Sequence, residues 1–301
     1  MKQIRGYVFT IVAAAGFGAQ PFLAKFVYSY GVGEVMLALL RVLCMTPVFG
    51  ILGVLNRERF KIPVRYMLRI ILLALTGAVL TTAMLFTAYN LIDTGTATTL
   101  NFTYPIFVLL LGRAAFKVKI QKHSLVSLII CIAGIVLFAN PSGAFSWSGF
   151  FLSLASGITY GFYVLYLDKS KIMEHTGFYT YTFYFFLAAS VMLLPIAGFS
   201  GELNFIIPTG GWMFILLFAI DGGILATVFL QIGIREIGSS KASILTALEP
   251  VTSIVLGVLF LQESLSIFSL IGIVLVIFSN IYLVFVPENR RKYSSTDNKV
   301  F

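Results

Sequence analysis

The sequence predicts an all-α polytopic membrane protein, and three observations lead to that fold class. Of the 301 residues, 59% are hydrophobic and only 11% are charged, whereas an average soluble domain has about 25% charged residues. The mean hydropathy is +0.97. The apolar residues also gather in runs close to the roughly 20 residues that a helix needs to cross a bilayer. Short polar links join these runs and leave no room for a separate soluble domain.

Ten apolar runs follow one another, and each predicts one membrane-spanning helix. The first run follows Lys2 and Arg5 and resembles the start of a signal peptide. It is too long for one and merges into the regular series, so we interpret it as a retained helix. The ten predicted helices cover residues 6–29, 33–55, 67–90, 95–116, 123–140, 147–167, 177–199, 210–233, 239–261 and 266–287.

The lysines and arginines predict the orientation of these helices. If the amino terminus lies inside, 19 of the 21 basic residues fall in inner links and tails, and none falls in an outer link. The other two, Lys25 and Arg41, fall within helices. Cytoplasmic links carry the excess of basic residues, so we predict a multi-pass protein of the cytoplasmic (inner or plasma) membrane with both termini cytoplasmic. The net charge of +9 forms no continuous patch, which argues against nucleic acid as a partner.

A repeat divides the chain. A shift of 145 residues aligns residues 88–116 with residues 233–261 without gaps, and it pairs Pro105 with Pro250. Chance matches are frequent in apolar sequence, so the shared proline and the constant shift carry most of the weight.

The repeat predicts two inverted halves. We expect a first five-helix repeat over 1–140, a second over 141–287, and a cytoplasmic polar tail over 288–301. Because five is odd, the second repeat enters the membrane upside down relative to the first. Inverted repeats are a transporter architecture, in which two related halves exchange conformations around a site near the midplane.

Motifs in two helices resemble a known family. The stretch "LEPVTSIVLGVLFLQESL" contains Glu249-Pro250, then Gly257, and ends near Glu263, while "VMLALLRVL" is an apolar run with one arginine, Arg41. These features resemble the EamA-type transporters of the drug/metabolite transporter (DMT) superfamily.

The resemblance covers residues 6–287 and is weaker in the first half. There the helix end reads "FKVK" without a glutamate, and Tyr104 stands where the family has the glutamate of Glu-Pro. The resemblance implies transport of small metabolites such as amino acids or nucleosides, and it does not name one.

Ionisable side chains at membrane depth are candidates for function, because charge is costly there. Glu249 lies roughly 15 Å from the inner end of its predicted helix, and Asp221 lies roughly 16 Å from the outer end of its own. Arg41 lies roughly 12 Å from an outer end, and Lys25 lies near one. All four are candidate substrate-binding or coupling residues. Structural interpretations stay open: Arg41 could pair with a carboxylate, and Lys25 could reach the outer headgroups.

Prolines and polar side chains complete the candidate site. Pro105 and Pro250 are predicted to bend their helices and to free a carbonyl one turn back, near Thr246 in the second repeat. Small faces around the remaining candidates could line a cavity or form ordinary helix interfaces. These remaining candidates are Gln20, Asn101, Tyr104, Tyr160, Tyr163 and Gln231.

The residues predict transport rather than catalysis. No P-loop, GxSxG or HExxH motif is present, so we predict no cofactor, no metal and no enzymatic activity. We expect a secondary transporter that exports small organic metabolites by alternating access. Coupling to protons is one way in which this transport could be driven. Two alternatives stay open: a membrane-embedded enzyme acting on a lipid-linked substrate, and a non-transporting helix-bundle accessory protein. The oligomeric state is not predicted.

The orientation gives a first testable prediction. A cytoplasmic reporter fused after Phe301 should be active and a periplasmic reporter should be inactive, because the carboxyl terminus is predicted to lie inside. Parallel fusions to a cytoplasmic and a periplasmic reporter measure this. Periplasmic activity would contradict both the ten-helix topology and the inverted repeat.

Overall fold

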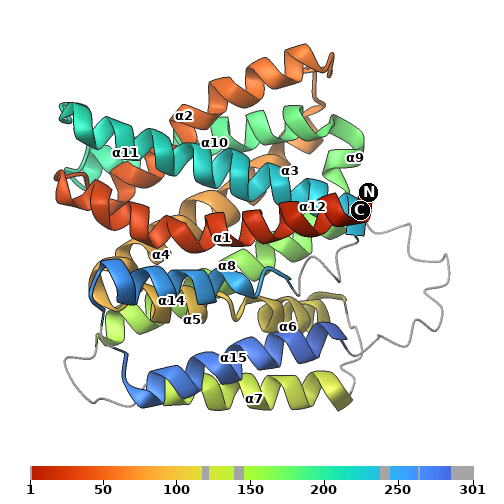
Figure 1. The fold of residues 1–301 in the computed structure, drawn as a ribbon. Coiled ribbons are helices and arrows are strands. Elements are labelled where there is room, and N and C mark those ends of the chain that lie inside the picture. The colour runs from red at the N-terminus through yellow and green to blue at the C-terminus, as the bar shows by residue number, and fades with distance from the viewer. Residues whose placement is uncertain (1, 117–121, 139–145, 238–244, 264, 286–301) are drawn as a thin grey trace.

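The computed structural model describes residues 2–116, 122–138, 146–237, 245–263 and 265–285, and within these ranges the regular structure is helical throughout. The helices lie side by side, and α1 begins at the same end of the molecule at which α15 finishes (Figure 1). Within the described ranges, six helices are long and apolar enough to cross a membrane, and shorter apolar helices accompany them. The predicted all-helical membrane class is confirmed.

Several predicted runs are single continuous helices. A helix satisfies its own backbone hydrogen bonds, which lipid requires of any spanning segment. A short helix, α9 (Ile172–Thr176), lies in the link after α8. The continuous helices are α1 (Lys2–Ser29), α2 (Glu34–Leu55), α7 (Lys122–Phe138), α8 (Trp147–Ser170), α10 (Phe178–Phe199) and α15 (Ile267–Phe285).

Two predicted runs contain a π-helical segment at mid-length. In both, a threonine hydroxyl donates to the carbonyl five residues earlier: Thr81 to Thr76 at 2.7 Å, and Thr227 to Gly222 at 2.8 Å. The 145-residue shift carries the first π segment onto the second, so the irregularity is repeated in both halves. The two runs are α3 (Val64–Ala74), η1 (Leu75–Leu80) and α4 (Thr81–Leu91), and α11 (Thr209–Ile220), η2 (Asp221–Val228) and α12 (Phe229–Ile237).

Two further runs are interrupted just before their prolines. A turn at 102–103 separates two helices, and a turn at 246–247 precedes another. Pro105 and Pro250 therefore lie in the first turn of a new helix, where a missing N–H leaves no intrahelical bond unmade. The prolines were expected to bend continuous helices, and the structure instead interrupts each helix. The helices concerned are α5 (Thr94–Asn101), α6 (Tyr104–Phe116) and α14 (Leu248–Phe260).

The carbonyls at these interruptions are held by the protein. The Thr246 carbonyl, expected to be free, accepts the backbone N–H of Glu249 at 2.9 Å. The Phe102 carbonyl accepts the side-chain amide of Asn280 in α15 at 2.9 Å. The following turn in one case, and a neighbouring helix in the other, thus supply the partner that lipid cannot.

Equivalent helices of the two halves pack against each other. Between α7 and α15, the Ser127 hydroxyl donates to the Ser279 carbonyl at 2.6 Å, and the Ser279 hydroxyl donates back to the Ser127 carbonyl at 2.7 Å. Gly134 lies against the backbone of Gly272 in the same interface. The 145-residue shift turns Ser127 into Gly272 and Gly134 into Ser279. The shift therefore maps the Ser127–Ser279 contact onto the Gly134–Gly272 contact in the same interface, as expected for halves related by a two-fold axis.

The other equivalent pair, α2 and α10, is tied by two carboxylates. Glu202, after the end of α10, accepts the N–H of Val35 in the first turn of α2 at 2.9 Å. Glu58, after the end of α2, accepts the N–H of Thr180 in the first turn of α10 at 2.7 Å. Each carboxylate satisfies N–H groups that have no intrahelical acceptor and lies at the positive end of a helix dipole. Sequence reasoning had assigned no role to either glutamate.

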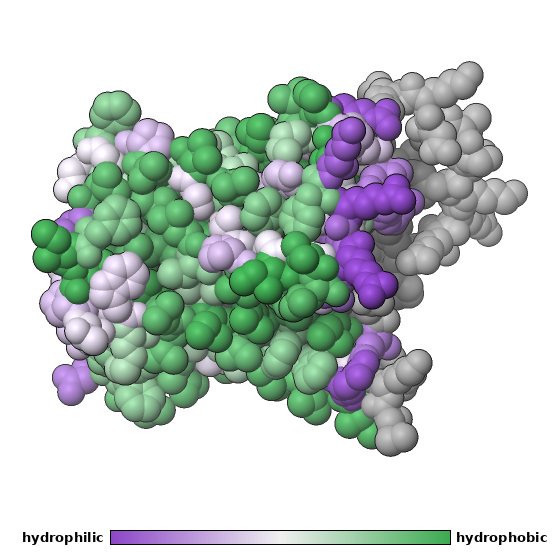
Figure 2. Space-filling view, turned by 90° about the horizontal axis from the view of Figure 1, so that it is seen from above, coloured by the Kyte–Doolittle hydropathy of each residue, from purple (hydrophilic) through white to green (hydrophobic). Residues whose placement is uncertain are grey.

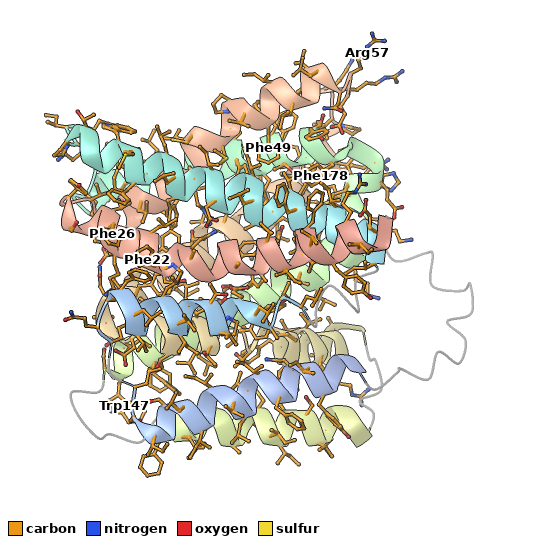
Figure 3. The ribbon with its side chains drawn as sticks, viewed as in Figure 1. Phe22, Phe26, Phe49, Arg57, Trp147 and Phe178 are labelled. Atoms are coloured by element: carbon orange, nitrogen blue, oxygen red, sulfur yellow. The ribbon has the colours of Figure 1, made fainter. Side chains whose placement is uncertain are left out.

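The surface has a hydrophilic end and a hydrophobic middle. Hydrophilic side chains gather at the end of the molecule where α1 begins, and the middle is hydrophobic (Figure 2). At that same end Arg57 points away from the helices, whereas Phe49 and Phe178 lie between α2 and α10 (Figure 3). Other apolar side chains are exposed on the outside of the helices, as suits a lipid-facing surface. They include Ile51, Ile129, Val191 and Leu259.

The paired carboxylates give a second testable prediction. Glu58→Ala and Glu202→Ala should each destabilise the folded protein by about 0.5–2 kcal/mol, as loss of a helix cap does. Their effects should add, because the two caps lie at opposite ends of the helix pair. Thermal unfolding of the purified protein measures this, with Glu174→Ala in the exposed α9 link as the control. A double variant no less stable than the wild-type protein would contradict it.

Candidate functional site

A cavity of about 370 Å³ lies among the helices, a size typical of small-molecule sites. Its wall comes from both halves: from α1, α2, η1, α4, α5 and α6, and from α8, α10, η2, α12 and α14. The two π segments and both interrupted helices contribute to it. The irregular segments of both halves therefore line the same cavity.

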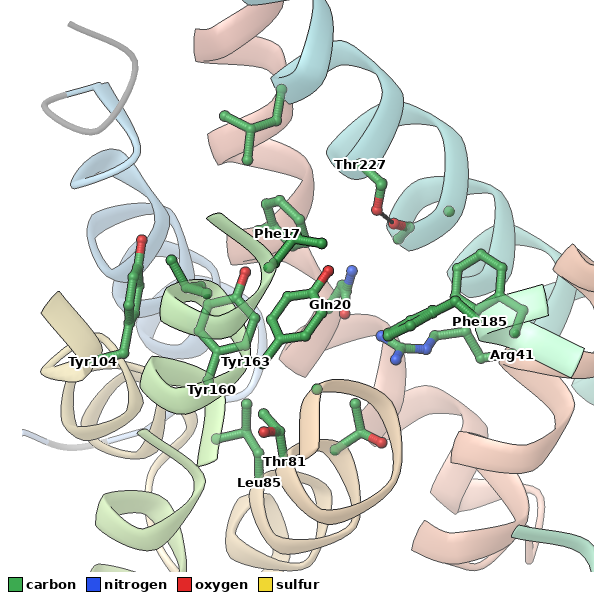
Figure 4. Close-up of a pocket in the computed structure, with 18 of the residues that line it drawn as sticks. Phe17, Gln20, Arg41, Thr81, Leu85, Tyr104, Tyr160, Tyr163, Phe185 and Thr227 are labelled. Atoms are coloured by element: carbon green, nitrogen blue, oxygen red, sulfur yellow. Dashed lines mark hydrogen bonds between the residues drawn. The ribbon is translucent and has the colours of Figure 1, made fainter. Parts of the chain in front are cut away.

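The structure brings most of the predicted site residues to this cavity (Figure 4). Asp221 and Lys25 are not among its lining residues, and the side chain of Gln231 lies outside the described part of the chain. The predicted residues that line the cavity are Gln20, Arg41, Asn101, Tyr104, Tyr160, Tyr163 and Glu249.

Asp221 lies in a helix interface. It is the first residue of η2, it is only 8% exposed, and it packs against Gly16 of α1. A Cβ atom at Gly16 would come within 2.7 Å of the Asp221 carboxylate, so the glycine makes room for it. This placement fits a role in holding α1 against η2.

Lys25 belongs to a charged group at the end opposite the start of α1. It lies within electrostatic reach of Glu263, Asp93 and Glu34. Glu263 also accepts both the backbone N–H of Thr94, at 3.0 Å, and its hydroxyl, at 2.9 Å. The carboxylate thereby caps α5 and ties it to the far end of α14.

Glu249 faces the cavity from the first turn of α14. The interruption before this helix creates a helix amino terminus inside the protein, where a negative charge is stabilised. The Glu249 carboxylate forms no hydrogen bond with the described residues. The break therefore explains the Glu-Pro pair: both residues lie in the first turn of α14, where proline leaves no intrahelical hydrogen bond unmade and glutamate lies at the positive end of the helix.

Arg41 enters the same cavity from α2. Its guanidinium carbon lies 5.6 Å from the centre of the Phe86 ring. In the described part of the chain its Nε–H has no acceptor, and no ion pair joins Arg41 to Glu249 or Asp221. The pairing of Arg41 with a carboxylate, which the sequence suggested, is absent among the residues that the structure describes.

Aromatic rings form one wall of the cavity. Tyr104 meets Tyr160 edge-to-face, with ring centres 4.8 Å apart, and Tyr160 stacks on Tyr163 at 5.6 Å. Tyr163 in turn contacts Phe185 of α10 at 5.6 Å. Rings in such arrangements present flat apolar surface together with phenolic hydroxyls.

Asn101 reaches the cavity but is already partnered. Its side-chain amide donates to the Ser156 hydroxyl at 2.8 Å, and that hydroxyl donates to the Ser153 carbonyl at 2.6 Å. This chain joins the end of α5 to α8, so Asn101 fixes the interruption as well as lining the space.

Some lining residues were not among the predicted ones. Tyr89, Phe185, Thr82 at the start of α4 and Thr227 of η2 line the cavity. Thr82 and Thr227 are paired by the 145-residue shift, so the repeat itself carried a signal that could have identified them. The same shift pairs Tyr89 with Ile234 and Phe185 with Leu40, so the repeat gives no such signal for these two residues.

An all-helical membrane protein whose two repeats enclose a central cavity has the architecture of a solute transporter. The EamA-like transporter family matches residues 4–140 and, a second time, residues 147–285. The chain belongs to this family, and the resemblance seen in its motifs is confirmed.

Individual relatives agree with this assignment. The chain is 33% identical to an uncharacterized transporter of Synechocystis sp. over 205 residues, which are 65% of this chain and 60% of that protein. It is 28% identical to Protein PecM of Dickeya dadantii over 230 residues, which are 74% of this chain and 75% of PecM. The chain thus spans less than two thirds of the Synechocystis relative.

A solved crystal structure shares the fold. It superposes with a TM-score of 0.64 over 92% of this chain and 96% of the other, at 15% sequence identity. At that identity the likeness concerns the fold alone.

The packing behind Glu249 gives a third testable prediction. A Cβ atom at Gly18 of α1 would collide with the Glu249 carbonyl and approach Thr252 to 2.6 Å. Gly18→Ala should therefore destabilise the protein by about 1–3 kcal/mol, as overpacking does. Gly112→Ala, whose Cβ would lie 4.0 Å from Leu165, should be neutral or stabilising. Thermal unfolding of both purified variants measures the difference, and equal midpoints would contradict the prediction.

Proposed function

We propose that this protein is a secondary transporter that exports small organic metabolites across the cytoplasmic membrane by alternating access. In this proposal ten helices form two inverted five-helix repeats, 1–140 and 141–287. The observation that carries the proposal is the cavity, because both repeats build it from their paired irregular segments. Discontinuous helices in corresponding positions are where transporter sites form.

The cavity suits access from the predicted cytoplasmic side. Its lining extends to Met173, in the link after α8, and to Phe178, the first residue of α10. On the predicted topology both lie at the cytoplasmic face. At the opposite end, Glu263 ties α14 to α5, and Asn90 donates to Glu34 at 2.5 Å. These contacts support an assignment of the structure to an inward-facing form that loads substrate from the cytoplasm.

Glu249 is the residue proposed to couple transport to protons. Two opposing effects act on its carboxylate: the helix amino terminus favours the charged form, and burial favours the neutral form. Such a balance allows the group to exchange a proton with the cavity, either with bulk solution or against a cationic group of the substrate. No partner in the described residues fixes its charge.

Flux measurements test the proposed function. The purified protein in proteoliposomes should move one or more members of a panel of labelled amino acids, nucleosides and organic acids. Empty liposomes provide the background. Absence of flux across the whole panel, from protein that keeps its fold, would contradict transport of this class of solutes.

A fourth testable prediction concerns Glu249. Glu249→Gln keeps the shape of the side chain and removes its titration, so flux should lose its dependence on an imposed pH gradient while the protein stays folded. Asp221→Asn makes the same chemical change outside the cavity and should keep that dependence. Proteoliposome flux at several internal and external pH values measures both. Unchanged pH dependence in the Gln variant would leave Glu249 with a structural role.

A further inference from the structure

Two hydrogen-bond donors in the cavity have no acceptor in the described residues. They are the Nε–H of Arg41, on α2, and the side-chain amide nitrogen of Gln20, on α1. Both atoms are buried, and both residues line the cavity. Figure 4 shows the two side chains pointing toward the space at the centre of the view. A buried donor without an acceptor is unfavourable and rare, so the pair indicates that an acceptor binds there.

Arg41 also lacks a counter-charge. The cavity contains the carboxylate of Glu249, yet the two charges form no ion pair in the described part of the chain. Tyr89 and Tyr160 lie within electrostatic reach of both, which places these two rings near each charge. An uncompensated charge at membrane depth costs several kcal/mol. The counter-charge that Arg41 needs can therefore be supplied by a bound anion.

The charges of the wall favour a carboxylate over a phosphate. Among the described lining residues, Arg41 is the single cation, and Glu249 adds a negative charge to the same space. One guanidinium matches one carboxylate, to which it can donate two parallel hydrogen bonds. A phosphate dianion would keep an uncompensated charge beside Glu249.

The remaining wall indicates what the anion is attached to. Tyr160, Tyr163 and Phe185 present continuous ring surface on one side, and Phe86 lies beneath the guanidinium. Flat apolar groups pack favourably on such rings.

We propose that Arg41, assisted by Gln20, is the anchor for the carboxylate of the transported molecule, and that the substrates are monocarboxylates with a flat apolar body. This inference rests on the proposed transport function and names its substrate class. In the inward-facing form the guanidinium would hold the carboxylate while the rings hold the body. The molecule thereby neutralises Arg41 during its passage.

Matched probes test the anchor. The full-length protein, purified in detergent, is titrated with 3-phenylpropanoate, with its uncharged amide 3-phenylpropanamide, and with phenyl phosphate, and binding is measured from the shift of the thermal midpoint. The carboxylate should stabilise the wild-type protein more than the amide or the phosphate does. Arg41→Gln should weaken carboxylate binding by about tenfold to a hundredfold, the effect of losing a charge-assisted hydrogen bond.

Two further variants serve as controls for the effect of Arg41→Gln. Arg41→Lys keeps the charge but not the planar fork, so it should prefer the carboxylate over the amide with reduced affinity. Arg59→Gln, on an exposed link, makes the same change as Arg41→Gln and should bind like the wild-type protein. The proposal is overturned if wild-type protein responds equally to carboxylate and amide or to neither, if it prefers the phosphate, or if Arg41→Gln keeps the carboxylate preference.

The outcomes also separate this inference from the proposed function. Flux of neutral metabolites without any carboxylate-dependent binding would overturn the anchor and leave transport in place. Carboxylate binding that depends on Arg41, without flux of any solute, would overturn transport and leave the anchor.

Discussion

The constraint on which the rest of the structure depends is that lipid offers no hydrogen bonds to the backbone. A continuous helix meets this constraint alone, and an interrupted helix needs partners from its neighbours. Here Asn280 holds the carbonyl exposed at the first interruption, and Glu263 caps the amino terminus of α5. Threonine hydroxyls serve the π segments in the same way. Irregular backbone can therefore exist at membrane depth, but only where the bundle surrounds it.

This constraint also determines where chemistry can occur. Each interruption or π segment departs from the regular α-helical hydrogen-bond pattern, and each contributes residues to the cavity wall. The break before α14 places Glu249 at a positive helix end inside the protein. Small residues such as Gly18 let α1 approach the same backbone. The irregular segments thus build much of the cavity wall, and among the described lining residues the carboxylate of Glu249 comes from one of them, whereas the guanidinium of Arg41 comes from the continuous helix α2.

Much of this arrangement could be predicted from the sequence, because long apolar runs and a repeat are local or periodic signals. The run 33–55, for example, became α2 from Glu34 to Leu55. Contacts between distant residues could not be predicted: Glu202 binds a residue 167 positions away. Asp221 was a candidate site residue, but its carboxylate lies against Gly16 of α1, which periodicity alone cannot show. Arg41 lies in the cavity wall, whereas its lack of a partner among the described residues depends on how side chains fill the cavity.

The carboxylate of Glu263 has no counterpart at the equivalent sequence position of the other repeat. The same shift of 145 residues leads from Glu263 to Val118, which carries no carboxylate. Two identical inverted repeats would make the inward- and outward-facing forms equal in energy, so every departure from identity tilts the balance between them. A hydrogen bond to a charged group contributes about 1.5–3 kcal/mol, and a contact made in only one form would shift the populations by about tenfold or more. In the proposed transport cycle, the protein would rest mainly in one of the two forms, and the lifetime of that resting form would set how quickly a new cycle begins.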